Sequence, residues 1–229
     1  RSRQRILSES YFEPSNAKRE FVICVSDMGE LVFAPTILKL IRKLAPHCRL
    51  RSMRVPAEQI EGLLAKGEAD LAIGTYRSAP EGLYKQRLFM HGFATLVHAK
   101  SKIKRKISLT DFERLPHIAV TLSGRSAIPF DSILEEKGIK RNVVMKTPHF
   151  LSVPFLIEQQ SDLIATIPVE LANVFSRHGL VRSVEPPLEL PSYAISQHWH
   201  PLFHHDPALI WLRDLIKRTF ETYPDLRES

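Results

Sequence analysis

The chain has 229 residues, of which 44% are hydrophobic and 25% charged, with a formal net charge of +7. These values are ordinary for a globular protein with one large domain or two small lobes. No apolar run is long enough to span a bilayer, and two cysteines, Cys24 and Cys48, are too few for a disulfide framework. The N-terminus RSRQRILSES lacks the apolar core of a secretion signal, which favours a reducing, cytoplasmic location. Because the first residue is Arg, we expect a fragment of a longer protein.

A positive net charge invites a nucleic-acid interpretation. The basic residues are scattered except for KSKIKRK at residues 100–106. This run has no interleaved aromatic residue, which favours a solvated loop over a loop that contacts DNA or a membrane.

The first part of the chain predicts alternating strands and helices. Residues 1–18 are expected to form a helix end and a linker, and the apolar residues 20–27 a buried strand. Apolar residues then recur at helical spacing up to Pro46, with Asp27 and Glu30 as a capping pair. Residues 48–55 alternate like a strand, a helix runs from Pro56 to Gly67, and residues 70–76 form the next strand. This order predicts a parallel sheet covered by helices.

The second part repeats the pattern. Strands are expected at residues 83–90 and 93–100, and further strands at 117–121, 143–147 and 163–167 alternate with helices at 126–137, 150–160 and 168–177. A strand at 192–200 and a helix that Asp206 caps and Pro207 begins complete the chain.

Two segments of the chain echo one another, GEADLAIGTY in the first half and QQSDLIATIP in the second. With the shared order of elements, the echo predicts an α/β fold of two similar Rossmann-like lobes joined by crossover strands. We expect a linker over residues 1–18, lobe I over 19–95 with 193–229, and lobe II over 96–192.

Open α/β sheets bind ligands beyond the carboxyl ends of their strands. Ser26 and Asp27 are expected at such an end and at the start of a helix, where backbone donors and the helix dipole favour an anion. His149 is expected at a strand-to-helix junction, in the position that Asp27 has in the other lobe, either contacting a ligand or capping the helix.

The catalytic motifs sought in the chain are absent. It has no Gly-x-Ser-x-Gly, no Walker loop and no Gly-x-Gly-x-x-Gly, and we predict no catalytic residue and no cofactor. The segment QHWHPLFHHD, residues 197–206, has a His-x-His pair that would suit a metal. A turn and helix cap, or contact with a ligand, is favoured over a metal site.

Several segments resemble, in order, the effector-binding domain of LysR-type transcriptional regulators, in the branch of nodulation and aromatic-degradation regulators. They are REFVICVSDMGELVFAPTILKLIRKLAP, GEADLAIG, RLFMHGFATLVHAKSK, ISLTDFERLPHI and HWHP…DPALIWLRDLI. The resemblance implies a fold like that of type 2 periplasmic binding proteins, a small effector between the lobes and no catalysis. It also implies a homodimer or homotetramer in which residues 35–44 pack against residues 153–160 of a partner. DNA would be bound only by an N-terminal domain that these residues lack, and no membrane is involved.

By position in the family, the effector contacts are expected at nine residues: Ser26, Met28, Val55, Tyr76, Thr121, His149, Phe150, Pro168 and His198. The effector is expected to be an aromatic or small organic acid. The branch often has Arg after Trp-His-Pro where this chain has Leu202, which would make the effector less acidic or differently held. The alternatives left open are a solute-binding protein that delivers a ligand to a transporter and a metal-dependent enzyme on the histidine cluster.

Overall fold

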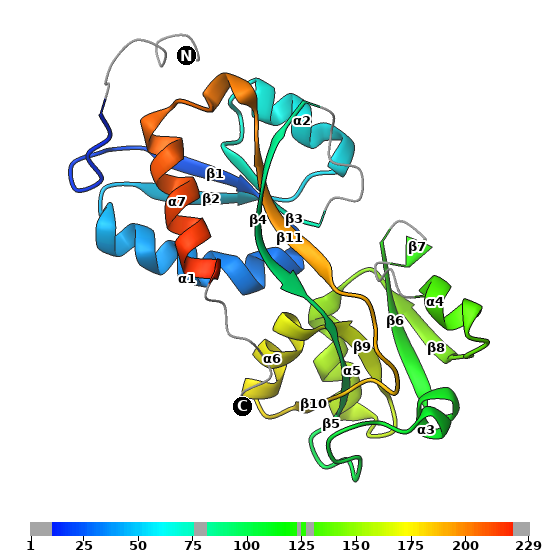
Figure 1. Cartoon of the computed structure of the whole chain (residues 1–229). Coiled ribbons are helices and arrows are strands. Elements are labelled where there is room, and N and C mark those ends of the chain that lie inside the picture. The colour runs from blue at the N-terminus through cyan, green and yellow to red at the C-terminus, as the bar shows by residue number, and fades with distance from the viewer. Residues whose placement is uncertain (1–10, 76–81, 123–124, 127–130, 222–229) are drawn as a thin grey trace. The chain divides into compact units, whose positions relative to one another are not determined.

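The structure is a computed structural model and describes residues 11–75, 82–122, 125–126 and 131–221. The chain forms two compact units (Figure 1). Unit 1 comprises the described residues within 1–89 and 194–229, and unit 2 those within 90–193. None of the described helices is long and apolar enough to cross a bilayer.

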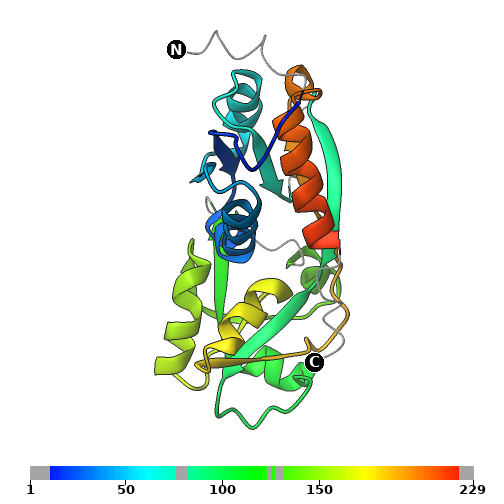
Figure 2. The same cartoon turned by 90° about the vertical axis from the view of Figure 1, so that its left-hand side faces the viewer.

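Unit 1 is a five-stranded sheet flanked by helices. Its sheet has the order β2-β1-β3-β11-β4, with β1, β2 and β3 parallel and β11 antiparallel to β3. Figure 2 shows α7 alongside β4, and the rings of Phe220 and Phe89 from these elements lie 6.4 Å apart. The strands are β1 Glu20–Cys24, β2 Arg49–Met53, β3 Leu71–Gly74, β4 Tyr84–His91 and β11 Tyr193–Trp199, and the helices α1 Asp27–Leu44, α2 Ala57–Ala65, the 3₁₀ turn η2 Pro201–Phe203 and α7 Pro207–Glu221.

Helix α1 begins one residue earlier than a cap at Asp27 would require. Ser26 is the N-cap, and its Oγ accepts a hydrogen bond of 3.1 Å from the Gly29 amide. Glu30 does not reach back to the cap, because its carboxylate accepts from the Ser52 hydroxyl at 2.5 Å. The prediction that Asp27 caps the helix with Glu30 is therefore wrong, and Asp27 is instead the first helical residue.

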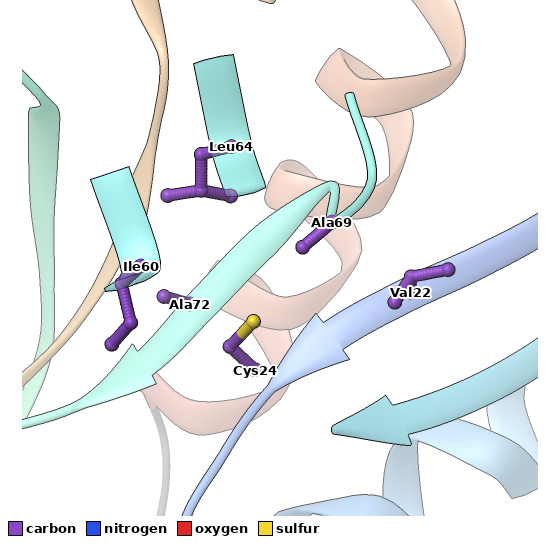
Figure 3. Packing of buried hydrophobic residues seen from close by; sticks show 6 residues of the cluster. All are labelled: Val22, Cys24, Ile60, Leu64, Ala69 and Ala72. Atoms are coloured by element: carbon purple, nitrogen blue, oxygen red, sulfur yellow. The ribbon is translucent and has the colours of Figure 1, made fainter. Parts of the chain in front are cut away.

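One part of the core of unit 1 forms where α2 packs on β1 and β3 (Figure 3). It contains a cluster of six buried residues: Val22, Cys24, Ile60, Leu64, Ala69 and Ala72. Burial raises the pKa of the Cys24 thiol to about 11, so this cysteine is a small hydrophobic residue in the core. Gly67 ends the helical segment with φ of 68°, and a Cβ there would lie 3.1 Å from the Phe203 ring. The predicted stop at Gly67 is confirmed.

An ionic cluster holds the start of β1, the start of β3 and the start of α7 together in unit 1. The guanidinium of Arg19 donates to Asp70 at 2.8 Å and to Asp206 at 3.0 Å. Asp70 also accepts from the Val22 amide at 2.7 Å, and Asp206 accepts from the Ala208 amide at 2.9 Å. Asp206 therefore caps α7, as predicted, and each carboxylate has both an ionic and a backbone partner.

Unit 2 contains two three-stranded sheets, of orders β10-β5-β9 and β7-β6-β8. Parallel hydrogen bonds between Ile118 and Ile164, and between Ile164 and Pro116, place the segment leading into β9 beside β6. The strands are β5 Phe93–His98, β6 Pro116–Leu122, β7 Arg125–Ser126, β8 Asn142–Thr147, β9 Ala165–Pro168 and β10 Val181–Val184, and the helices α3 Leu109–Arg114, α4 Asp131–Glu136, the 3₁₀ turn η1 Phe150–Ser152, α5 Val153–Gln159 and α6 Val169–Arg177.

The two units share one topology. The succession β8-β6-β9-β5-β10 in unit 2 matches β2-β1-β3-β11-β4 in unit 1, with antiparallel β5 in the place of β11. The predicted similarity of the two halves is confirmed. It also corrects one equivalence, because His149 follows β8, the counterpart of β2, and so corresponds to the segment at Val55, not to Asp27. The helix predicted from residue 126 begins at Asp131, since Ser126 lies in β7.

Candidate functional site

The carboxyl ends of β1, β2 and β3 meet at one edge of unit 1 because these strands are parallel and in register. Ser26 and Met28 follow β1 there, Ser26 exposed and Met28 half-buried. Since the Ser26 oxygen already accepts from Gly29, its hydroxyl proton is what it can offer a ligand. At this edge Val55 is half-buried and packs against the core cluster of Figure 3, so it presents only part of its side chain.

Acidic groups occupy the first turn of α1. Asp27 and Glu30 lie there, and one buried carboxylate oxygen of Asp27 has no hydrogen-bond partner among the described residues. These carboxylates already use the favourable dipole at the helix start. The amino end of α1 therefore favours an anion less than the sequence predicted.

The two remaining predicted contacts of unit 1 are Tyr76 and His198. Tyr76 lies outside the described residues. His198 pairs with Ala72, inside the sheet and not at its edge, and only 1% of its surface is exposed. Burial, with a smaller effect of the Lys85 charge, lowers the pKa of His198 to about 4, so the ring is neutral at pH 7. Its side chain belongs to the interior of the sheet in this structure.

The four predicted contacts of unit 2 all lie near the carboxyl edge of its parallel strands. Thr121 is half-buried near the end of β6, one register step beyond the pair of Val120 with Thr147 on β8. His149 and Phe150 follow β8 directly, and Pro168 ends β9. The structure therefore brings Thr121, His149 and Phe150 to neighbouring strand ends.

His149 is held by its backbone while its imidazole is exposed. Its amide donates to the Thr147 hydroxyl at 3.2 Å, and its carbonyl oxygen accepts from the Ser152 hydroxyl at 3.1 Å. The imidazole makes no capping hydrogen bond, which leaves both ring nitrogens for another partner. Of the two readings that the sequence left open, helix capping is excluded. Phe150 beside it is only 5% exposed, so its ring mainly supports this turn.

Pro168 is buried at the start of α6, and polar groups that the sequence reasoning missed lie around it. Glu170, in the first turn of α6, has a carboxylate oxygen 3.5 Å from Nδ1 of His91, and both side chains are buried. The hydroxyls of Thr95 and Thr166 form a buried hydrogen bond of 2.9 Å between β5 and β9. The signal for this pair was a threonine in the middle of each apolar run, FATLVH and LIATIP.

The histidine cluster of residues 198–206 is used within unit 1. The Trp199 indole donates to Nδ1 of His204 at 3.1 Å, and the two rings stack at 6.0 Å. Nδ1 of His200 accepts from the Leu202 amide at 3.2 Å as the cap of η2. No group of three or more metal-ligating side chains occurs among the described residues. The structure thus supports the turn-and-cap interpretation over the metal site.

Leu202, at the position where Arg is frequent in the branch, is 74% exposed on η2. Because β11 runs antiparallel to β3, its end lies at the opposite edge of the sheet from Ser26 and Val55. The departure from the family pattern therefore leaves the side chains of the strand-end site unchanged.

Comparison with known proteins gives consistent matches. The family model described as LysR substrate binding domain matches residues 15–221. The HTH-type transcriptional activator NagR of Ralstonia sp is 31% identical over 94% of this chain and 71% of its own, and Nodulation protein D 2 of Sinorhizobium fredii is 30% identical over 92% and 68%. The regulatory domain of MexT, a transcriptional activator in Pseudomonas aeruginosa, superposes with a TM-score of 0.77 at 29% identity, covering 88% of this chain and 99% of that domain. These relatives are regulators, and nothing among them favours a transport protein. The chain therefore belongs to the LysR substrate binding domain family and is the effector-binding domain of a LysR-type transcriptional regulator.

Proposed function

We propose that this chain senses a small aromatic or organic acid at the strand ends described above and binds it without transforming it. The signal would pass to DNA through an N-terminal domain outside these residues, in the cytoplasm. The mechanism is a population shift, in which the effector favours the arrangement that it binds more tightly.

One observation carries this proposal: the exposed imidazole of His149, on a backbone fixed by Thr147 and Ser152. A group fixed in place loses little conformational freedom on binding, which favours a specific contact. A protonated or neutral imidazole can donate to a carboxylate oxygen, and the hydroxyl of Thr121 lies on the neighbouring strand for a second contact.

The test is isothermal titration calorimetry with benzoate, phenylacetate and cinnamate. We expect at least one of these acids to bind, and His149→Ala to weaken its binding by about tenfold, the value of one hydrogen bond to a charged group. His178→Ala is the matched control, because His178 is an exposed histidine of the same unit at the far end of α6. An unchanged affinity in His149→Ala would remove this residue from the site.

We also propose a homodimer, or a tetramer built from it, through α1 of one subunit and α5 of its partner. Both helices expose large apolar side chains, with Leu38 44% and Leu44 41% exposed on α1, and Phe155 60% exposed on α5. Basic residues flank the α1 patch, and α5 has Glu158. The two surfaces are thus apolar at the centre and complementary in charge at the rim.

Sedimentation or light scattering tests this arrangement. Phe155→Glu and Leu38→Glu should each shift the chain toward monomer, because a buried unpaired carboxylate opposes association. Leu109→Glu is the control, since Leu109 is similarly exposed, at 45%, but lies on α3. A dimer that survives both helix variants would contradict the proposed interface.

A further inference from the structure

The basic loop between β5 and α3, residues 99–106, has a fixed conformation. The guanidinium of Arg182 on β10 donates to the carbonyl oxygens of Ser101 at 2.9 Å and Lys104 at 2.7 Å, and also to that of Ile103. Three main-chain acceptors on one guanidinium fix the path of the loop. The charged side chains of the loop are exposed, as predicted, while its backbone is held in one conformation.

A cavity of about 280 Å³ lies beside this loop. Val97 and Ile164 line it with buried side chains, and Ile103 and Leu115 with half-buried ones. The cavity lies at the amino ends of β6 and β9. It is thus at the opposite edge of unit 2 from Thr121, His149 and Pro168, and no part of the proposed effector site lines it.

Four charged side chains line this cavity, and two of them already form a pair. Arg114 donates to Asp111 at 2.8 Å, so these two charges compensate each other. Lys102 and Asp162 make no ion pair or side-chain hydrogen bond to any described residue, and both are exposed. The cavity therefore offers one unpaired cation, one unpaired anion and an apolar surface.

We propose that this cavity binds a free α-amino acid with an apolar side chain. Its carboxylate would pair with Lys102, its ammonium group with Asp162, and its side chain would cover the apolar surface. A simple carboxylate or a simple amine could pair with only one of these two charges, whereas a zwitterion can pair with both. The volume of the cavity lies below the range of about 300–1,000 Å³ that is typical for drug-sized ligands, which suits a smaller molecule such as an amino acid.

Calorimetry with L-leucine and L-phenylalanine at millimolar concentration tests the proposal. We expect one or both to bind, and N-acetyl-leucine and leucinamide, which each lack one charge, to bind about tenfold more weakly. Asp162→Asn and Lys102→Gln should each lower the affinity for the amino acid, again by about tenfold. Lys104→Gln is the matched control, because Lys104 lies on the same loop outside the cavity lining and contributes only its carbonyl oxygen.

Three results would overturn this inference: no binding of either amino acid, equal affinity in wild type and both charge variants, or loss of binding in His149→Ala. The last result would place the amino acid at the predicted effector edge, so the cavity proposal would fail while the sensing function stood. Circular dichroism of the variants checks their fold, which substitution of exposed side chains should leave intact.

Discussion

Units 1 and 2 share a strand order but stabilise it with different polar chemistry. Unit 1 joins three elements with charges, through Arg19 between Asp70 and Asp206. Unit 2 joins its central strands with neutral groups, through the hydroxyls of Thr95 and Thr166. The topology thus fixes where strands lie, and the groups that connect them are free to differ between the repeats.

The largest expected effect comes from breaking the ionic cluster of unit 1. Arg19→Met would leave Asp70, only 8% exposed, without its cation, and should lower the free energy of unfolding by about 3 kcal/mol, measured by urea denaturation. The control in unit 2 is Arg105→Met, because Arg105 is 88% exposed in its pair with Glu185. This variant should lower the free energy of unfolding by less than about 1 kcal/mol. Equal losses in both variants would mean that burial does not decide how much an ion pair of this protein contributes to stability.

Acid should weaken both units through one buried histidine in each. His117 donates from Nε2 to the Phe112 carbonyl oxygen at 2.5 Å, and burial lowers its pKa from 6.5 to about 4, as it does for His198. Between these values the unfolded chain binds a proton that the folded chain does not. The free energy of unfolding should therefore fall as the pH drops through this window. Each of the two histidines should contribute a loss of about 1.4 kcal/mol per pH unit.

Glutamine variants separate the two contributions. His117→Gln and His198→Gln remove one titrating group each, so the loss of stability between pH 6.5 and about 4 should become smaller in either variant. Urea denaturation across that range measures it. A slope unchanged from wild type would show that the substituted histidine is not the group that charges on unfolding.

A smaller effect is expected from the hydroxyl pair of unit 2. Thr95→Val leaves the Thr166 hydroxyl buried without a partner and should cost about 1–2 kcal/mol of unfolding free energy. The double valine variant should recover most of this loss, because no polar group then remains unpaired. Additive losses in a double-mutant cycle would mean that the two hydroxyls do not act as a pair.

The smallest effect concerns equivalent glycines after α2 and α4. Gly67 and Gly138 have φ of 68° and 67°, so alanine at either should cost about 1 kcal/mol. Only at Gly67 would the new Cβ also meet Phe203, at 3.1 Å, while nothing lies within 4 Å at Gly138. Thermal unfolding should show the larger loss for Gly67→Ala.

The repeat of strands and helices was predictable because apolar periodicity is a local property of the chain. The start of α1 was not, since Ser26, Asp27 and Glu30 are all plausible capping residues and only the packing of Glu30 against Ser52 decides among them. Helix α3 was missed although Ser108 caps it, its hydroxyl accepting from the Asp111 amide at 3.0 Å, because six residues show little periodicity.

The candidate site was predictable at its strand ends and not inside the sheet. Thr121 and His149 lie near the carboxyl edge because parallel strands of any α/β sheet end there. The place of His198 depends on the register of β11 against β3, which joins residues far apart in the sequence. Long-range register also creates the buried pair of His91 with Glu170, which no local pattern shows.

The place of β11 has a consequence for synthesis on the ribosome. In the sheet of unit 1, β11 lies between β3 and β4, although about a hundred residues separate it from β4 in the chain. A nascent chain that stops before Ala194 therefore has every strand of unit 2 but lacks the strand that joins β3 to β4. The strands of unit 2 can therefore be complete before the sheet of unit 1 is, and premature termination would leave an unpaired, aggregation-prone edge on β3.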